Sequence, residues 1–235
     1  MYLFYCPDIE TKQTLSEEES GHCVRVLRYS AGDEILITDG KGTTYTARIT
    51  NPHPKHCDFE IISSEKQEPH HNFHLHIAIA PTKNIERLEW CIEKCVEIGV
   101  DEITPLLCRF SERKQLRTDR LDKIILSAAK QSLTPYLPVL HELTPYDAFI
   151  SSQKAEVSVQ KFIAHCYKED KRVLKEEIER GKDVLVLIGP EGDFSEQEVA
   201  EALAAGFIPV SLGNSRLRTE TAGVVACHTA ILLNS

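Results

Sequence analysis

A short, unbroken run of apolar residues in the C-terminal quarter constrains the fold of this chain most. Residues Val184–Ile188 read VLVLI, and a turn-forming GPEG segment, Gly189–Gly192, follows at once. A strand that is apolar at every position leaves no face for solvent, so both of its faces must be covered. Such strands are typical of the centre of a parallel sheet with helices on both sides. We therefore expect an α/β domain built around this run.

The segments on either side of this run alternate between helix and strand patterns. In Asn84–Val100, apolar residues recur at spacings of three and four, which indicates an amphipathic helix. Ser195 and Glu198 have the spacing of a capping box, and Phe194 and Val199 are placed to form a hydrophobic staple around it. Other predicted strands are 73–80, 103–107, 161–166 and 208–212, and other predicted helices are 118–132 and 219–233. This alternation predicts a mostly parallel sheet.

The N-terminal part of the chain has a different pattern. Residues 34–49 hold two strand patterns joined by a glycine-containing turn, and residues 57–62 alternate as a third strand. Residues 63–72 are polar, as expected of a domain boundary. We therefore expect two domains: a small, barrel-like β domain over residues 1–70 and the α/β domain over residues 71–235.

Composition and charge narrow the class of protein. The net charge of −9 argues weakly against a protein that coats nucleic acid, since such proteins usually carry a basic surface. No run approaches the roughly 18 apolar residues that a membrane span needs, and the N-terminus lacks the features of a signal peptide. The 8 cysteines are scattered without a Cys-x-x-Cys pair, which is typical of reduced thiols. We therefore expect a cytoplasmic protein.

The one metal-like feature of the sequence is a group of histidines. His74 and His76 would share one face of a strand, and His70 and His71 lie just before them. No suitably spaced carboxylate or thiol completes a metal site, so we expect solvent-facing histidines and no bound metal.

Two loops at predicted strand ends combine glycine with charged residues. One is Ile188–Ser195 and the other is Leu212–Gly223. In open α/β sheets, ligands bind beyond the carboxyl ends of the strands, and glycine lets backbone approach a ligand closely. Neither a dinucleotide-binding GxGxxG motif nor a phosphate-binding P-loop is present. Ordinary turns are also rich in Gly and Pro, but two such charged loops favour a binding site.

Basic residues gather in one stretch of the chain. From Arg109 to Lys130, seven basic side chains stand against three acidic ones, a local charge of +4 in a chain of −9. A solvated helix face explains this pattern as well as a phosphate-contacting strip does. The residues that such a strip would use are Arg109, Arg113, Lys114 and Lys130, with Arg25 and Arg28 of the N-terminal domain extending it.

Short segments along the chain together resemble one family, the RsmE-type 16S ribosomal RNA uridine-N3 methyltransferases of the SPOUT superfamily. The resemblance covers nearly the whole chain; each segment is weak alone, but their order makes the match specific. The segments are His22–Arg28, Gly32, Asp33, Asp39, Gly40, Lys83, Arg87–Trp90, Glu93, Lys94, Glu97–Val100, Lys130–Ser132, Gly189–Gly192, Phe194, Ser195, Glu198 and Leu217–Ala222.

The resemblance implies a PUA-like β-barrel followed by an α/β SPOUT domain whose C-terminal segment is threaded into a deep trefoil knot, a rare feature in proteins. It implies S-adenosyl-L-methionine (SAM) as cofactor, a homodimer, and N3 methylation of a specific uridine in 16S ribosomal RNA. An assembled small ribosomal subunit as substrate would be compatible with the acidic net charge. The implied cofactor-binding residues are Leu187, Ile188, Gly189, Pro190, Glu191, Gly192, Leu212, Gly213, Leu217, Arg218 and Thr219.

Two positions depart from the family pattern. The family usually reads GPEGG, whereas this chain has Asp193 at the fifth position; if that position needs a positive φ, Asp tolerates it less well than Gly. The family tends to read LGPRILR, whereas Leu212–Arg218 read LGNSRLR. Ser215 therefore takes the place of the first arginine, and Arg216 lies one position later. Arg218 aligns without ambiguity.

Methylation at N3 requires control of a proton, because N3–H of uridine is a weak acid. We expect Arg218 to stabilise negative charge on the uracil carbonyls. Glu191 or Glu220 would accept the proton if it is buried, although Glu220 also suits the positive end of the last helix dipole. Two other hypotheses remain: a SPOUT enzyme with a different RNA target, and a non-catalytic RNA-binding protein, which would not need SAM.

Overall fold

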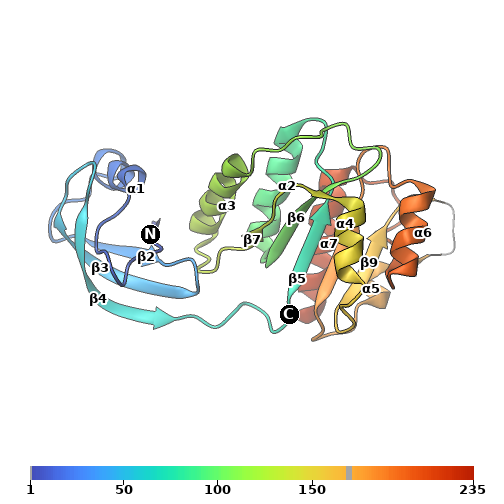
Figure 1. Cartoon of the computed structure of the whole chain (residues 1–235). Helices are drawn as coiled ribbons and strands as arrows, with labels where there is room; N and C mark the ends of the chain where they lie inside the picture. Colours follow the sequence, from blue (N-terminus) through green and yellow to red (C-terminus); the bar gives the residue numbers. More distant parts are fainter. Residues whose placement is uncertain (1, 168–170) are drawn as a thin grey trace. The chain divides into compact units, whose positions relative to one another are not determined.

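The computed structural model describes residues 2–167 and 171–235 (Figure 1). The chain separates into two compact units, Met1–Pro69 with Leu126–Leu137, and His70–Ile125 with Pro138–Ser235. The sequence does not reveal that Leu126–Leu137 group with the first unit, since the pattern of helix α3 (Thr118–Ser132) runs through this boundary without a break.

The first unit contains one four-stranded sheet in the order β1-β2-β3-β4. Strands β2, β3 and β4 pair antiparallel, as the hairpin patterns predict, and β1 pairs with β2 in parallel. The apolar face of the sheet closes over a core that includes Phe4, Ile37 and Phe59. The bounds are β1 Leu3–Tyr5, α1 Glu17–Gly21, a π-helical turn His22–Val26, β2 Glu34–Thr38, β3 Thr43–Asn51 and β4 Asp58–Lys66.

The segment after α3 packs against this sheet through Tyr136. A Cβ added to Gly42 would lie 2.1 Å from the Tyr136 ring, and Gly42 has a φ of +96°, so only glycine fits there. The Tyr136 hydroxyl donates to the backbone oxygen of Gln67 at 2.8 Å. These contacts explain why Leu126–Leu137 belong to the first unit.

The second unit is built on an eight-stranded sheet with the order β10-β12-β9-β11-β5-β6-β7, with β8 also paired to β6. Its strand pairs are parallel, and β11 lies between β9 and β5 with all five residues buried. This confirms that the VLVLI run is a central, covered strand. The bounds are β5 Leu75–Ile79, β6 Glu102–Leu107, β7 Val139–Leu140, β8 Thr144–Pro145, β9 Gln160–Ala164, β10 Arg172–Val173, β11 Val184–Ile188 and β12 Ile208–Ser211.

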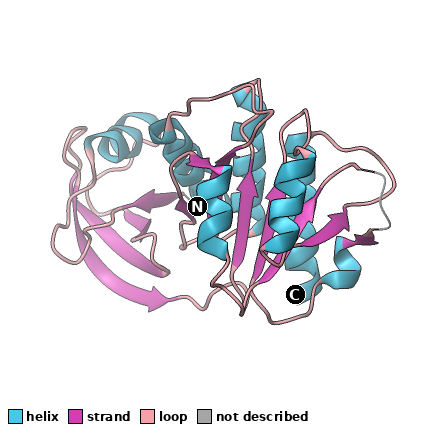
Figure 2. Ribbon diagram, turned by 45° about the vertical axis from the view of Figure 1, so that its right-hand side comes forward, coloured by secondary structure: helices cyan, strands magenta, loops and turns pink. Residues whose placement is uncertain are grey.

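Helices cover both faces of this sheet, as Figures 1 and 2 show. Helices α2 and α7 pack on each other and on one face, whereas α4 and α6 lie against the other. Alternate residues of β11, Leu185 and Leu187, belong to the core on the α4 and α6 side. The bounds are α2 Ile85–Ile98, α4 Tyr146–Gln153, α5 Leu174–Glu177, α6 Glu196–Ala204 and α7 Thr219–Asn234.

Hydrogen bonds define the ends of two of the predicted helices. Ser195 caps α6 in a capping box with Glu198. Gly99 ends α2 in the left-handed conformation, with its N–H donating to the backbone oxygens of Cys95 and Val96. Helix α4 was not predicted, because its few apolar residues do not form a regular stripe.

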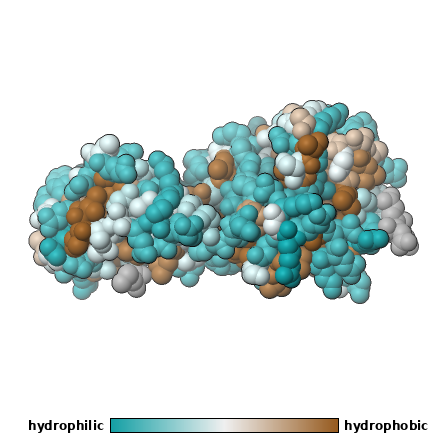
Figure 3. Space-filling view, turned by 90° about the horizontal axis from the view of Figure 1, so that it is seen from below, coloured by the Kyte–Doolittle hydropathy of each residue, from teal (hydrophilic) through white to brown (hydrophobic). Residues whose placement is uncertain are grey.

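The face of the molecule in Figure 3 is mostly hydrophilic, and its hydrophobic side chains gather in separate patches. No helix in the described part of the chain combines the length and the apolar character needed to cross a membrane.

Candidate active site

The loops that follow β9, β11 and β12 meet at one edge of the sheet. These three strands are neighbours in the parallel sheet, so their carboxyl ends point the same way. Two cavities lie among these loops, the first of about 430 Å³ and the second of about 460 Å³. The site therefore forms where ligands bind in open α/β sheets.

The two cavities adjoin each other. They share wall residues from the loops after β9 and β12 and from α7, namely Ala164, Cys166, Arg216, Leu217 and Ala222. Their volumes each fall in the range of about 300–1,000 Å³ that is common for small-molecule sites. Either cavity is therefore large enough to hold a small-molecule ligand.

Most of the predicted cofactor-binding residues line these cavities. Those at the first cavity are Ile188, Gly189, Pro190, Glu191, Leu217, Arg218 and Thr219. Leu212 and Gly213 line the second cavity. Leu187 and Gly192 line neither: Leu187 is fully buried in the core, and a Cβ added to Gly192 would lie 3.0 Å from the side chain of Phe110.

Several residues that line the first cavity were not among the predicted cofactor-binding residues. Arg87, Asp193 and Arg216 bring charge to the first cavity, and Ala164 and Cys166 bring in the loop after β9. Arg87 is distant in sequence from the two charged loops and reaches the wall because α2 packs on α7. The loop after β9 carries neither glycine nor a recognisable motif, so nothing in the sequence marked it.

Two of the loop residues have conformations that explain their residue types. Gly213 has a φ of +135° with open space where a side chain would start, so its backbone is bare toward the second cavity. Asp193 has a φ of +67°, which confirms that the fifth position of the GPEGG-like segment needs a positive φ. Gly189 is constrained by space instead, since a Cβ there would lie 3.0 Å from the Phe194 ring.

The start of α7 is tied to the loop after β11. The Thr219 hydroxyl donates to the backbone oxygen of Gly189 at 3.0 Å, and this hydrogen bond is buried. The backbone N–H of Ala222 donates to the oxygen of Arg218 at 2.8 Å and begins the helix. The two charged loops are therefore held together by the first turn of the last helix.

The two candidate proton acceptors differ in their surroundings. Glu220 is 7% exposed; its Oε1 lies 3.8 Å from Nε of Arg87, and its buried Oε2 has no hydrogen-bond partner in the described structure. Glu191 is exposed, and its Oε1 accepts the backbone N–H of Lys83 at 2.9 Å. Of the two, only Glu220 has a buried oxygen with unused acceptor capacity.

Arg216 and Arg218 are exposed at the cavities. Among the described residues, no hydrogen bond or ion pair engages either guanidinium group. Free guanidinium groups at the wall of a cavity are suited to binding carboxylates, phosphates or developing negative charge.

Comparison with known proteins identifies the family. A family model for an RNA methyltransferase domain matches residues 69–231, and a model for an RNA methyltransferase PUA domain matches residues 15–62. The ribosomal RNA small subunit methyltransferase E of Mesomycoplasma hyopneumoniae is 30% identical over 172 residues, which cover 70% of this chain and 72% of that protein. The chain belongs to the ribosomal RNA small subunit methyltransferase E family.

Solved structures agree with this family. A probable rRNA-methyltransferase from Porphyromonas gingivalis is 44% identical, with a TM-score of 0.92 and 99% of both chains covered. A ribosomal RNA small subunit methyltransferase E from Neisseria gonorrhoeae, bound to S-adenosyl methionine, is 26% identical, with a TM-score of 0.86 over 100% of this chain and 98% of that one. The resemblance seen in the sequence is confirmed, as is an α/β fold with a parallel sheet and an N-terminal PUA-like domain.

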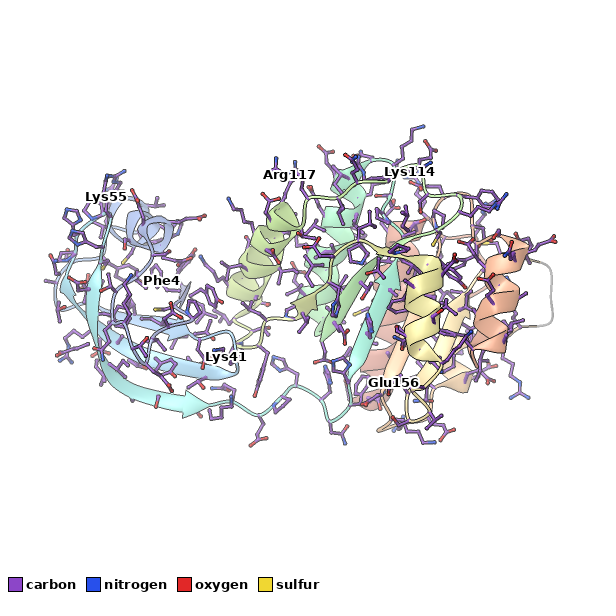
Figure 4. All side chains as sticks on the ribbon, in the orientation of Figure 1. Phe4, Lys41, Lys55, Lys114, Arg117 and Glu156 are labelled. Atoms are coloured by element: carbon purple, nitrogen blue, oxygen red, sulfur yellow. The ribbon has the colours of Figure 1, made fainter. Side chains whose placement is uncertain are left out.

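The basic residues expected to contact RNA differ in their exposure to solvent. Arg25, Arg28, Arg109 and Lys114 are exposed, and Figure 4 shows Lys114 and the nearby Arg117 pointing outward from the second unit. These side chains are accessible to a phosphate backbone.

Two of the expected RNA-binding residues have other roles. Lys130 forms an ion pair with Glu19, and the two side chains are only 13% and 6% exposed. Its ammonium group therefore neutralises a buried carboxylate inside the first unit. Arg113 donates to the backbone oxygens of Thr82 and Lys83, at 3.2 and 2.8 Å, and so supports the loop before α2. The sequence cannot separate such residues from exposed ones, because all lie in the same basic stretch.

The expectation of solvent-facing histidines is wrong for two of the four. His71 bonds to the backbone oxygens of Phe73 and Gly99, and its side chain is only 7% exposed. His76 is buried and bonds to the Thr104 hydroxyl at 2.8 Å. Burial lowers the pKa of His76 to about 4. No group of three or more His, Cys, Asp or Glu side chains within the described ranges is placed to hold a metal ion.

Proposed function

We propose that this chain is a SAM-dependent methyltransferase that methylates N3 of a specific uridine in 16S ribosomal RNA, the expected family site being uridine 1498. The observation that carries the proposal is the pairing of unlike groups at the start of α7. The guanidinium group of Arg218 is free at the first cavity. Glu220, two residues later, lines neither cavity but has a buried carboxylate oxygen with no hydrogen-bond partner among the described residues. Membership of the ribosomal RNA small subunit methyltransferase E family supports methylation of this RNA.

The residues at the cavities fit SAM. The bare backbone at Gly213 and the apolar side chains of Ile188 and Leu217 suit an adenosine group. Carboxylates and guanidinium groups at the same walls match the ammonium and carboxylate of the methionine part. When bound, SAM supplies a methyl group already activated on a sulfonium.

Arg218 and Glu220 would have different roles in the reaction at the uracil ring. The Arg218 guanidinium would stabilise negative charge that develops on the uracil carbonyl oxygens. Glu220 would accept the N3 proton through its unpartnered oxygen, directly or through a water molecule. We assign this role to Glu220 rather than Glu191, because the Glu191 carboxylate is exposed and already accepts the Lys83 N–H.

Access to N3 restricts the form of the RNA. N3 lies on the Watson–Crick edge and is hidden in a base pair, so the target uridine must be unpaired or pulled out of its helix. Holding that base in line with the cofactor contributes much of the rate enhancement, since well-oriented reactants can gain several kcal/mol. The second cavity provides the space beside the cofactor.

The small domain and the basic residues would position the substrate. We propose that residues 1–70 form an RNA-binding domain and 71–235 a SPOUT methyltransferase domain, with phosphate contacts from Arg25, Arg28, Arg109 and Lys114. The substrate would be the assembled small ribosomal subunit, because a chain with a negative net charge gains little binding free energy from the phosphates of naked RNA. Methylation would take place in the cytoplasm.

A deep trefoil knot and a homodimer also belong to the proposal. The hydrogen bond between Thr219 and Gly189 is compatible with a C-terminal segment threaded past the loop after β11. Trp90 on α2 and Leu232 on α7 are 44% and 62% exposed, and large apolar side chains on these helices suit a dimer interface.

Isothermal titration with SAM, followed by transfer from isotope-labelled SAM to small ribosomal subunits lacking 3-methyluridine, tests the proposal. We expect SAM binding and labelled 3-methyluridine as the product. Label in a different nucleoside would favour another RNA target and overturn the proposed specificity. Absence of SAM binding would favour a non-catalytic RNA-binding protein.

A further inference from the structure

Asp193 uses its side chain as well as its backbone at the first cavity. Its Oδ2 accepts the backbone N–H of Cys166 at 2.7 Å, and its Oδ1 accepts that of Phe194 at 2.9 Å. The backbone N–H of Asp193 donates to the oxygen of Pro190 at 2.9 Å and closes the turn. Both carboxylate oxygens are therefore engaged by backbone donors.

One of these hydrogen bonds crosses between two loops. Cys166 follows β9, whereas Asp193 follows β11, and Cys166 lines both cavities. The Tyr167 hydroxyl makes a second crossing bond, to the backbone oxygen of Phe194 at 2.8 Å. The wall shared by the two cavities is thus attached to the loop after β11 at two neighbouring points.

An aspartate at position 193 strains the backbone. A positive φ is strained for residues other than glycine, and Asp193 is one of three such residues in the described ranges, with Arg28 and Leu133. Glycine would satisfy the turn without strain but would lose both side-chain hydrogen bonds. The carboxylate therefore has a use that offsets the strain.

We propose that Asp193 is a positioning residue: its carboxylate holds the Cys166 segment against the loop after β11 and so sets the shape of the cofactor cavity before the cofactor binds. The cofactor part of this inference rests on the proposed function. The loop attachment itself is a property of the free protein and is testable without any ligand.

Replacement of Asp193 separates this role from a general contribution to folding. Asp193→Gly relieves the strain and removes both side-chain bonds, so affinity should fall while thermal stability does not. Asp193→Asn tolerates the positive φ but has a single acceptor oxygen, so it retains at most one of the two bonds from the backbone donors. Leu133→Gly is the matched control, because it relieves a positive φ in the first unit, away from both cavities.

The test combines amide hydrogen exchange of the free protein with isothermal titration of SAM. We expect exchange at the Cys166 amide to rise, and SAM affinity to fall, by about tenfold in Asp193→Gly, with smaller changes in the same direction in Asp193→Asn. Leu133→Gly should change neither. Unchanged exchange at Cys166 in Asp193→Gly, or a loss of affinity shared by Leu133→Gly, would overturn the proposal. If the unmodified protein failed to bind SAM, the proposed function would fail, whereas the exchange measurement would still test the loop attachment.

Discussion

Nε of Arg87 lies 3.8 Å from Oε1 of Glu220, and this ion pair joins α2 to the first turn of α7. Arg87 lines the first cavity, while the second oxygen of Glu220 is buried and, among the described residues, has no hydrogen-bond partner. A buried carboxylate oxygen is costly when it is left without a donor. The ion pair therefore holds the Glu220 carboxylate in place and leaves one of its oxygens without a donor.

Glu220→Gln should remove the proton acceptor while keeping the side-chain shape. We expect the rate of methyl transfer to fall by about 100-fold or more, the range for loss of a general base. Single-turnover rates with saturating SAM measure this step. Glu196→Gln, at an exposed first-turn position of α6, is the control; equal rates in the two variants would contradict the assignment.

Arg218→Ala should abolish turnover and leave the fold intact. The side chain is exposed and unpaired among the described residues, so its loss should change the free energy of unfolding by no more than about 0.5 kcal/mol. Loss of charge stabilisation should lower the rate by about 100-fold or more. Urea denaturation and methyl-transfer rates check the two halves of this prediction, and normal methylation would refute it.

Thr219→Val should loosen the attachment between α7 and the loop after β11. It leaves the backbone oxygen of Gly189 buried without its donor, which should cost about 1–3 kcal/mol of unfolding free energy. Thr229→Val on the same helix removes a hydroxyl that bonds to the helical oxygen of Val225, so it should cost less. Chemical denaturation of both variants measures their unfolding free energies. Equal losses of unfolding free energy would contradict a special role for the Thr219–Gly189 hydrogen bond.

His76 should make the protein less stable in mild acid. Burial lowers its pKa to about 4, whereas an unfolded histidine titrates near 6.5. The unfolded state then binds the proton more tightly, so stability is complete above pH 6.5 and falls as the pH drops toward 4, by up to about 3 kcal/mol. Denaturation of the unmodified protein and His76→Gln across this range measures the difference; parallel pH profiles would rule the effect out.

Lys130→Met should destabilise the first unit. It leaves Glu19 as an uncompensated buried charge, which typically costs about 3–5 kcal/mol. Lys114→Met, at an exposed position, should leave stability unchanged and lower the salt dependence of RNA binding instead. Denaturation midpoints of both variants, compared with that of the unmodified protein, measure the loss of stability. A fully stable Lys130→Met protein would show that the ion pair has no structural role.

The fold was largely predictable because its signals are local. The VLVLI run at Val184–Ile188 needs cover on both faces, and the capping box at Ser195 and Glu198 depends on residues close together in the sequence. The placement of Leu126–Leu137 with the first unit was not predictable, since it depends on Tyr136 meeting Gly42, a residue far away in the sequence.

The site was predictable only where motifs exist. The loops after β11 and β12 carry glycine and charge, and both line the cavities. Arg87 and Cys166 reach the site through helix and strand packing, which leaves no mark on the local sequence. Burial also separated Glu220 from Glu191 and Lys130 from Lys114, although each pair has the same residue type.

The most direct test of the central claim is nucleoside mass spectrometry of small-subunit ribosomal RNA from a strain lacking this gene. We predict that 3-methyluridine is absent, returns when the gene is restored, and does not return with the Arg218→Ala variant. An unchanged level of 3-methyluridine in the strain lacking the gene would contradict the claim.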